Sequence, residues 1–403
     1  MAEPLLAGLK VIDAASFIAA PVAATMLADF GADVIKIEPP TGDSYRGLST
    51  FPGFPSSDVD YAYMMDNRSK RGFALDLRQE AGRAVLRELV AGADVFITNY
   101  PPLVRERLGL SYEDIAPLNE RLIYASLSAY GETGPEVHRT GFDSTAFWAR
   151  TGLMDLVKPD PDGAPARSLP GMGDHPTGVT LFAAIMTALY RRQITGKGGK
   201  AYTNLMANGV WCNAFYTQAA LCGLDIPTRP KRENWATGLA NHYRCADGRW
   251  FILSLVNEEK QWPNLLRAIN RSDLATDSRF AEKPARHRHA RDLVAVLDEV
   301  FLRQAWPFWQ QRLEEEGLAF GVIGRTEDIS GDPQMQAADI IIPHDDPSGL
   351  STHTVGSPVW LEGSEKTAPC PAPRIGQHTD EILAELGRTP EDIKALRASG
   401  VVA

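Results

Sequence analysis

The first 130 residues of this chain alternate short apolar runs with stretches of helical periodicity, and this alternation restricts its possible folds most. The run LKVIDA at 9–14 precedes the helical pattern of Pro21–Phe30, and DVIKIE at 33–38 follows. The same order returns in FALDLR, the helical EAGRAVLRELVAGA, DVFITN and, after another helical stretch, LIYASLSAYG. Strands connected through helices pair in parallel and carry helices on both faces of the sheet. The pattern therefore predicts an α/β domain with a parallel sheet.

This alternation is typical of a Rossmann-like domain, but the glycines of a dinucleotide site are missing. The first junction between strand and helix is AASFIAAP rather than GxGxxG, which argues against a nicotinamide enzyme. The segment GKGGK at 196–200 follows a helical pattern instead of opening one, so we interpret it as a helix C-cap and turn rather than a phosphate loop.

A change in composition near Gly223 indicates a domain boundary. The stretch LDIPTRPKRENWATG is rich in proline and charge, as linkers often are. Beyond it we expect a smaller α+β domain with strands in YRCADGRWFILSLV and helices in DLVAVLDEVFLRQ and PFWQQRLEEEG. Proline-rich sequence then leads to a final helix in DEILAELG.

Charge and cysteine content exclude several functional classes. Lysine and arginine number 41 against 51 aspartates and glutamates, a formal charge of −10, which disfavours nonspecific nucleic-acid binding. The four cysteines are scattered and form no CxxC pair, so neither a disulfide framework nor a zinc site is indicated. Glu3 stands where a signal peptide is basic, and no apolar run reaches membrane-spanning length. We expect a cytoplasmic protein without a membrane segment.

The segment GMGDHPTGVTLFAAIMTALYRRQITGKGGK places Asp174 among glycines just before a long helical pattern. Aspartate is a favoured N-cap residue, so Asp174 has an ordinary structural interpretation. Gly171, Gly173 and Gly178, however, leave its carboxylate little covered by neighbouring side chains. The helix N-terminus is expected to keep the carboxylate ionised, as a nucleophile requires. Cap and nucleophile are both open on this pattern alone.

Basic residues at or near the ends of the predicted strands are candidates for binding an anionic ligand. Ligands of parallel α/β sheets lie beyond the carboxyl ends of the strands, where Lys36, Arg78, Arg105 and Arg107 are expected. The alternative is that these side chains are simply solvated. His175 is the histidine beside Asp174, and is interpreted either as a base or as a filler of the first helical turn. No histidine, cysteine and carboxylate cluster suggests a metal, and no GxSxG suggests a serine hydrolase.

Ordered segments along nearly the whole chain resemble the family III CoA-transferases, the CaiB/BaiF group of carnitine and formyl-CoA transferase-like proteins. The resemblance is carried by LAGLKVIDAASFIAAPVAATMLADFGADVIKIEPP, NRSKRGFALDLR, ITNYPPLVRERLGL, YASLSAYGETGP, TGFD, GMGD, TGKGGK, YRCADGRW and APRIGQHTDEILAELG.

The resemblance implies that Asp174 attacks the thioester of an acyl-CoA to give an aspartyl anhydride and then an enzyme–CoA thioester, from which a carboxylic acid takes the CoA. Gly173 and neighbouring N–H groups are expected to stabilise the oxyanions. Acyl-CoA and the acid are the expected partners, succinyl-CoA is one candidate donor, and no prosthetic group is expected. The residues that the resemblance assigns to coenzyme A are Phe17, Ile18, Leu75, Arg78, Asn99, Tyr100, Arg107, Arg139 and Thr140, with Asp143 near the reacting centre.

The family fold implied is a Rossmann-like CoA-binding domain formed by 1–225 and 331–403, a small α+β domain at 226–330, and an interlocked homodimer. Two departures bear on the substrate. Pro39 replaces a basic residue that some relatives place after KIE, and ENWATGLANHYR replaces the polyglycine loop of relatives that handle formyl and oxalyl groups. An acyl group larger than formyl is favoured.

Two alternatives accompany this interpretation. A 2-methylacyl-CoA racemase on the same fold needs an acid and a base on opposite faces of its substrate, and racemases carry a histidine where this chain has Phe142. A non-catalytic CoA-binding subunit of a heteromeric transferase is the other. The acid itself is open between a dicarboxylate held by Arg46 and Arg68 and an aromatic or branched acid lined by Tyr61, Trp148 and Trp211.

Overall fold

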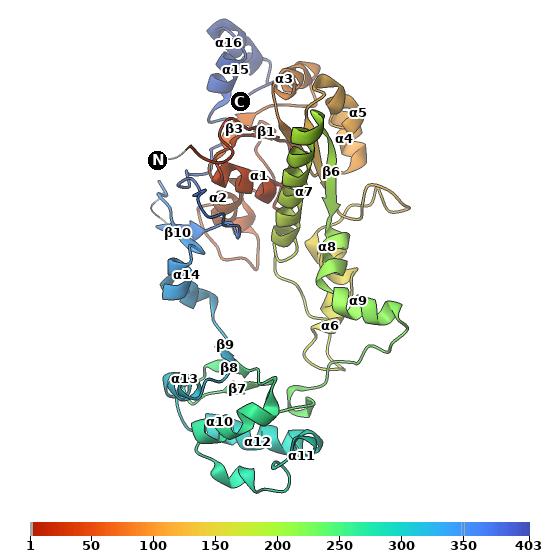
Figure 1. Ribbon diagram of the computed structural model, residues 1–403. Helices are drawn as coiled ribbons and strands as arrows, with labels where there is room; N and C mark the ends of the chain where they lie inside the picture. Colours follow the sequence, from red (N-terminus) through yellow and green to blue (C-terminus); the bar gives the residue numbers. More distant parts are fainter. Residues whose placement is uncertain (1–2, 348, 350) are drawn as a thin grey trace. The chain divides into compact units, whose positions relative to one another are not determined.

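The computed structural model describes residues 3–347, 349 and 351–403. The chain divides into two compact units (Figure 1). The larger unit consists of Met1–Met154, Arg167–Asp225 and Pro333–Ala403, and the smaller of Asp155–Ala166 and Ile226–Asp332. Both chain ends therefore belong to the larger unit.

The larger unit is built on a parallel sheet of six strands in the order β3-β2-β1-β4-β5-β6. Their bounds are β1 Lys10–Asp13, β2 Asp33–Glu38, β3 Arg71–Ala74, β4 Val95–Thr98, β5 Ile123–Ser128 and β6 Gly199–Asn204. This is the order of the doubly wound Rossmann fold. The predicted α/β class and parallel sheet are confirmed, whereas β6 was not anticipated because GKAYTN lacks an apolar run.

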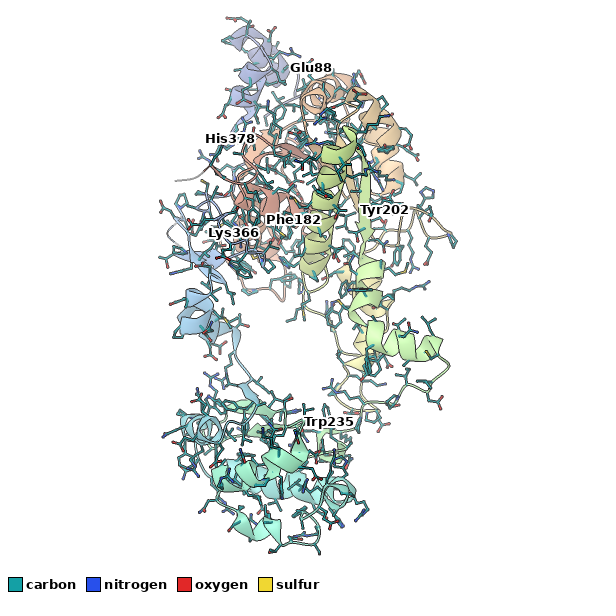
Figure 2. All side chains as sticks on the ribbon, viewed as in Figure 1. Glu88, Phe182, Tyr202, Trp235, Lys366 and His378 are labelled. Atoms are coloured by element: carbon teal, nitrogen blue, oxygen red, sulfur yellow. The ribbon has the colours of Figure 1, made fainter. Side chains whose placement is uncertain are left out.

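Helices cover both faces of this sheet because its strands are apolar on both sides. On one face, Val11 packs in a core with α1 (Ala19–Asp29) and α7 (Asp174–Thr195), where Phe182 stacks on Phe30 at a ring-centroid distance of 6.2 Å (Figure 2). On the other face, Ile12 packs with α3 (Glu80–Ala91) and α15 (Thr379–Glu385). The alternation of Val11 and Ile12 follows from the two-residue period of a strand.

The chain order reverses between β1 and β4, which are neighbours in the sheet. To one side of this point the strands run to β2 and β3, and to the other side they run to β5 and β6. The connections after β1 and β4 leave the sheet in opposite directions and open a crevice beyond the carboxyl ends of these strands. Such a switch point is the usual ligand site of open α/β sheets.

The end of α7 agrees with the sequence prediction for GKGGK. Gly196 adopts φ +74° and is the C-cap, its N–H donating to the Arg192 carbonyl, and β6 begins at Gly199. A glycine at this position ends the helix without the steric cost of a left-handed side-chain residue. No phosphate loop is formed by this segment.

Short helices and one hairpin complete the larger unit. They are η1 Leu48–Thr50, α2 Tyr61–Asn67, α4 Pro102–Leu108, α5 Tyr112–Ile115, η2 Ala116–Leu118, the π-helix η3 Asp143–Ala149, α8 Leu205–Cys212, α9 Ala214–Leu221, α14 Pro333–Ala337, the hairpin β10 Ile341–Pro343 with β11 His353–Val355, and α16 Pro390–Ala398. The four-residue helix α6, Leu153–Leu156, lies where the chain passes between the units.

The smaller unit has its own aromatic core between helices and an antiparallel sheet. The sheet consists of β7 His242–Arg244, β8 Trp250–Leu253 and β9 Phe320–Val322. The helices are η4 Arg232–Asn234, α10 Glu258–Ala268, η5 Ser272–Ala275, α11 Lys283–Arg288, α12 Ala290–Phe301, α13 Trp306–Glu315 and η6 Thr326–Gly331. An α+β composition was predicted for this region.

Among the described residues, none of the helices combines the length and the apolar character needed to cross a bilayer. All four cysteines are free thiols, and Cys245 is buried while Cys212, Cys222 and Cys370 are exposed.

Candidate active site

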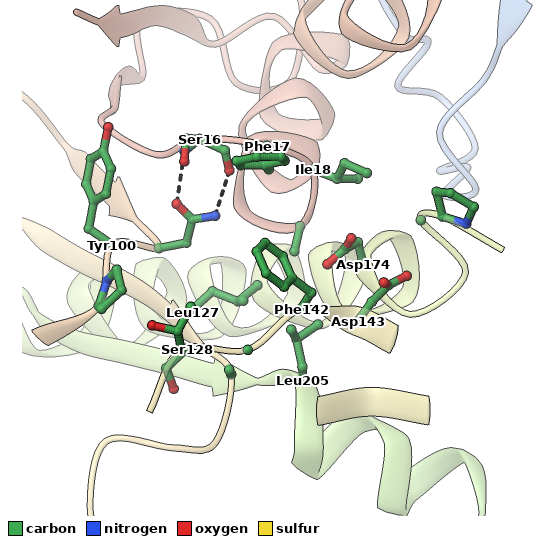
Figure 3. Close-up of a pocket in the computed structure, with 18 of the residues that line it drawn as sticks. Ser16, Phe17, Ile18, Tyr100, Leu127, Ser128, Phe142, Asp143, Asp174 and Leu205 are labelled. Atoms are coloured by element: carbon green, nitrogen blue, oxygen red, sulfur yellow. Dashed lines mark hydrogen bonds between the residues drawn. The ribbon is translucent and has the colours of Figure 1, made fainter. Parts of the chain in front are cut away.

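A cavity lies at the switch point of the sheet, between the loops that follow β1 and β4. Ser16 and Asn99 hold these loops together through two hydrogen bonds, which Figure 3 marks with dashed lines. The Ser16 N–H donates to Asn99 Oδ1 at 2.9 Å, and Asn99 Nδ2 donates to the Ser16 carbonyl at 2.7 Å. The Asn99 carboxamide thereby hydrogen-bonds both the N–H and the carbonyl of Ser16, and holds the backbone that leads into α1.

Phe17 follows in a strained backbone conformation with φ +60°. A residue with a side chain held there costs on the order of 1–3 kcal/mol and is typical of ligand sites. The ring is 37% exposed, and its centroid lies 6.2 Å from each of the Tyr45 and Phe142 rings. The strain therefore places an aromatic face at the cavity rather than in the core.

The cavity has a volume of about 330 Å³ and is predominantly apolar. Its lining comes from six parts of the larger unit: Ser16–Ala19; Leu48 and Phe54; Asn99–Pro102; Leu127–Ala129; Val137 with Arg139–Asp143; and Pro170, Gly171, Asp174 and Leu205. Figure 3 shows Tyr100 toward one end and the Asp174 and Asp143 carboxylates side by side toward the other, with Phe17 and Phe142 between them.

Asp174 is not a helix cap. The N-cap of α7 is Gly173, no side chain caps this helix, and Asp174 is the first helical residue. Its partly exposed carboxylate lines the cavity instead. The position of Asp174 relative to the helix start therefore excludes the cap, and the role of nucleophile stays a prediction.

The prediction that the helix N-terminus keeps Asp174 ionised is wrong. The pKa of this carboxyl is raised to about 7, first because burial disfavours its charge and second because the Asp143 carboxylate repels it. Asp66 adds to the repulsion, and His175 opposes it. Partial charges at a helix end shift such groups by less than burial and a second carboxylate do here.

Asp143 stands at the start of η3 and is 7% exposed. Its Oδ2 accepts the Gly173 N–H at 3.3 Å. This bond ties the backbone before the nucleophile candidate to η3. It also occupies the N–H that we expected to stabilise an oxyanion, which corrects that expectation for Gly173.

The three glycines around Asp174 also serve the packing of the chain itself, a role that the sequence did not indicate. A Cβ on Gly171 meets the His175 ring at 2.7 Å, and one on Gly173 meets Phe147 at 2.7 Å. A Cβ on Gly178 meets the Ala19 carbonyl oxygen at 2.6 Å. Gly173 and Gly178 let α7 approach η3 and α1 closely, and Gly171 leaves room for the His175 ring.

Seven of the ten residues predicted for catalysis or coenzyme A line the cavity, and three do not. Those in the lining are Phe17, Ile18, Asn99, Tyr100, Arg139, Thr140 and Asp174. Leu75 is 1% exposed and packs in the core on the other face of the sheet. Arg78 lies at the surface in an ion pair with Asp76, with Nε 2.8 Å from Oδ1. Arg107 is exposed on α4.

Two of the basic residues considered from the strand ends are not available to an anion. Lys36 is fully buried with its Nζ 3.0 Å from Asp43 Oδ2. Arg105 is 3% exposed, and its guanidinium pairs with Glu132 at 2.9 Å. Both side chains were candidates for binding phosphates. Lys36 in β2 and Arg105 in α4 instead form ion pairs with carboxylates inside the larger unit.

Several lining residues were not anticipated from the sequence. Ser128 ends the strand LIYASLS and Ala129 follows it, so the rule of strand carboxyl ends was sufficient to find them. Leu48 begins the short helix η1, Phe54 lies in the irregular segment after it, and Leu205 begins α8. Nothing local in the sequence marks these three, because only the folded chain brings them to the cavity.

His175 does not line this cavity. Its ring borders a second, largely apolar cavity of about 640 Å³, and its Nε2 lies 3.2 Å from Asp66 Oδ1. Among the described residues, no histidine lines the cavity of Asp174. The position where racemases were expected to carry a histidine is Phe142, 56% exposed toward the cavity.

Comparisons with known proteins agree on one family. Residues 6–379 match the model described as CoA-transferase family III. The chain is 35% identical to (R)-2-hydroxy-4-methylpentanoate CoA-transferase from Clostridioides difficile, over 99% of each chain. It is 32% identical to succinyl-CoA:glutarate CoA-transferase from Mus musculus, over 98% of this chain and 90% of that one. A CAIB/BAIF family protein from Brucella suis has a similar structure, with a TM-score of 0.85 at 30% identity, covering 96% of this chain and all of the other.

Proposed function

This chain belongs to CoA-transferase family III, and we propose that it transfers coenzyme A from an acyl-CoA to a carboxylic acid through covalent intermediates on Asp174. The observation that carries the proposal is the Asp174 carboxylate in the lining of a cavity at the switch point of the sheet. A carboxylate suits this chemistry because its anhydride with an acyl group retains the activation needed to remake a thioester.

Each proposed step exchanges one activated carboxyl group for another. An oxygen of Asp174 attacks the thioester carbonyl carbon, the C–S bond breaks, and CoA leaves as a thiolate. The thiolate attacks Cγ of Asp174, which releases the first acid as a carboxylate and leaves an aspartyl thioester. The acceptor carboxylate then attacks Cγ, displaces the thiolate and forms a second aspartyl anhydride. Finally the thiolate attacks the acyl carbonyl of this anhydride, which forms the new acyl-CoA and releases the Asp174 carboxylate. No oxidant, reductant or net proton is consumed.

We propose that the larger unit holds coenzyme A, since every lining residue of the cavity belongs to it. Tyr100 is proposed to lie along the pantetheine arm, toward the end of the cavity away from Asp174. Asn99, which precedes Tyr100 in the cavity lining, is proposed to contact the same arm. Arg139 is 55% exposed at the rim and pairs with Glu136, so it is proposed as a surface contact for the anionic part of the molecule. The assignments of Leu75, Arg78 and Arg107 stay predictions.

We propose that the donor and acceptor acids are apolar monocarboxylic acids, whose one carboxyl forms the thioester. Donor and acceptor acyl groups must occupy the same space beside Asp174 in turn, so one lining serves both. Arg46 forms a bidentate pair with Glu38, and Arg68 pairs with Asp29 at 2.7 Å. Both guanidinium groups are outside the cavity lining, as are Tyr61, Trp148 and Trp211.

A second carboxylate in this cavity would therefore meet Asp143 and Asp174 without a free cation among the described lining residues. Desolvating an unpaired charge beside like charges is unfavourable. Leu48, Phe54, Phe142 and Leu205 instead offer an apolar surface. This supports an acid of the kind in the name of the Clostridioides difficile relative over a dicarboxylate of the kind in the name of the mouse relative.

The purified chain alone is expected to transfer CoA from 4-methylpentanoyl-CoA to apolar acids. With 3-phenylpropanoate as acceptor, we expect kcat/KM on the order of 100-fold above that with glutarate, because glutarate brings an uncompensated charge. Product acyl-CoA is measured by mass spectrometry. Succinyl-CoA is compared with 4-methylpentanoyl-CoA as the donor, because it brings a second carboxylate into the cavity.

Other outcomes of this assay separate the alternatives. A preference for glutarate or succinyl-CoA overturns the acid class but leaves the transferase. Loss of an α-deuterium without acyl exchange indicates a racemase, and activity only with a second protein indicates a heteromeric subunit.

We propose that the protein is a homodimer. Helix α9 buries none of its side chains, and Trp211, Phe215 and Leu221 are each at least 76% exposed on α8 and α9. Apolar groups gathered in this way usually mark a protein interface. An interlocked arrangement is what the family resemblance implies, and light scattering on the same preparation gives the mass.

The rate of transfer is expected to increase as pH rises through about 7 and then to level off. Only the ionised form of Asp174 is nucleophilic, and its raised pKa leaves it protonated at lower pH. Below the transition, kcat/KM should fall about tenfold per pH unit. A profile that stays flat from pH 5 to 8, as for an ordinary aspartate, contradicts this assignment.

A further inference from the structure

His175 follows the nucleophile directly, yet both of its ring nitrogens are engaged away from the reaction cavity. Nδ1 lies 2.9 Å from the carbonyl oxygen of Gly171, and Nε2 lies 3.2 Å from Oδ1 of Asp66 on α2. The other oxygen of Asp66 accepts the Tyr45 hydroxyl at 2.7 Å. Asp66 is 2% exposed, so these side chains are its main compensation for burial.

These acceptors determine the protonation of the ring. A backbone carbonyl can only accept, so Nδ1 must carry a hydrogen. An ionised carboxylate also only accepts, so Nε2 must carry a second hydrogen, which makes the ring an imidazolium. The electrostatics agree: burial opposes the charge, but the hydrogen bond and the charge of Asp66 outweigh it and raise the pKa of His175 to about 9.

Of the three charged side chains that shift the pKa of Asp174, the His175 imidazolium is the positive one. Asp143 on η3 and Asp66 on α2 disfavour ionisation of the nucleophile, and His175 favours it. Helix α1 packs along α7 and carries one charged residue, Asp29, which is paired with Arg68.

The same ring also holds the backbone before the nucleophile. Gly171 adopts φ +80°, and its carbonyl accepts both from the His175 ring and from the His175 N–H at 2.9 Å. The turn that leads into Asp174 is thus closed by the residue that follows it.

We infer that His175 is a positioning residue, an imidazolium at neutral pH that fixes the Gly171 turn and provides the counter-charge that keeps Asp174 nucleophilic there. It neither takes nor gives a proton in the reaction. This role rests on the proposed function of Asp174.

The test is the pH profile of His175→Gln. Glutamine keeps a hydrogen-bond donor for Asp66 but carries no charge, so the acidic limb of kcat/KM should move up by about one pH unit. The rate should fall roughly tenfold at pH 6 and agree with the unmodified enzyme within about twofold above pH 9. KM should change little because the ring does not line the cavity. His289→Gln removes an exposed histidine paired with Asp292 in the smaller unit and serves as the matched control.

The outcomes separate this inference from the proposed function. An unmodified enzyme without transfer activity contradicts the proposed function itself. An active enzyme whose His175→Gln variant keeps the original limb, or loses the same factor at every pH, overturns the inference, since a purely structural role produces the latter. Nitrogen NMR of the labelled protein gives a readout independent of activity: the His175 ring should stay an imidazolium at pH 8, and titration near 6.5 overturns the inference.

Discussion

Asp174→Ala is expected to abolish CoA transfer, with kcat reduced on the order of 10⁴-fold or more. The carboxylate is the proposed attachment point of both the acyl group and CoA, and alanine offers no atom for either bond. The fold should survive because the side chain neither caps α7 nor forms a hydrogen bond or ion pair within the described part of the chain. Loss of a carboxyl whose pKa is raised by burial also removes a desolvation cost.

Transfer is measured by acyl-CoA exchange, and folding by thermal unfolding of the same preparation. Glu80→Ala is the matched control, since Glu80 is also the first residue of a helix, α3, but is exposed and outside the cavity. Incubation of the unmodified enzyme with acyl-CoA and hydroxylamine should modify the peptide that contains Asp174. Turnover retained by Asp174→Ala, or a clean peptide after trapping, contradicts the covalent mechanism.

Gly178→Val is expected to destabilise the larger unit by about 2–3 kcal/mol and to impair transfer as well. A Cβ at this position meets the Ala19 carbonyl oxygen at 2.6 Å and Val22 Cγ1 at 2.7 Å, so a branched side chain forces α1 away from α7. Better helix propensity than glycine offsets well under 1 kcal/mol of this cost. Because α1 begins just after Phe17 and Ile18, its displacement also moves the cavity wall relative to Asp174.

The expected decrease in melting temperature is roughly 5–10 °C, measured by calorimetry. Gly324→Val is the matched control, since no heavy atom lies within 4 Å of a Cβ there and the backbone does not require glycine. Wild-type stability for Gly178→Val contradicts the close helix crossing.

The sequence predicted the scaffold of the site better than its electrostatics. Asp174 was identified because glycines precede a strongly periodic helix, but the same pattern fits a cap, and only the helix start at Asp174 with Gly173 as N-cap excludes that role. The packing role of the glycines was not anticipated. Gly173 and Gly178 let η3 and α1 approach α7, and contacts between residues 26 and 159 positions apart leave no local pattern.

The surroundings of Lys36 and Arg105 could not be predicted from local sequence patterns either. Position at or near a strand end suggested a phosphate contact for both, yet the fold supplies Asp43 and Glu132 as ion-pair partners. Whether a basic side chain faces a ligand or a carboxylate depends on side chains from other elements, and a strand pattern does not encode them.

The alternation of apolar runs and helical stretches determined by itself that this chain forms a parallel sheet with helices on both faces, because hydrophobic periodicity is a local property of the sequence. The GMGD segment likewise placed one carboxylate at a helix start. The strand order, and with it the switch point between β1 and β4, came only from the structure. Tertiary structure alone decided the pKa of that carboxyl. Asp143 and Asp66 reach it from 31 and 108 residues away, and Coulomb interactions depend on distance in space rather than along the chain.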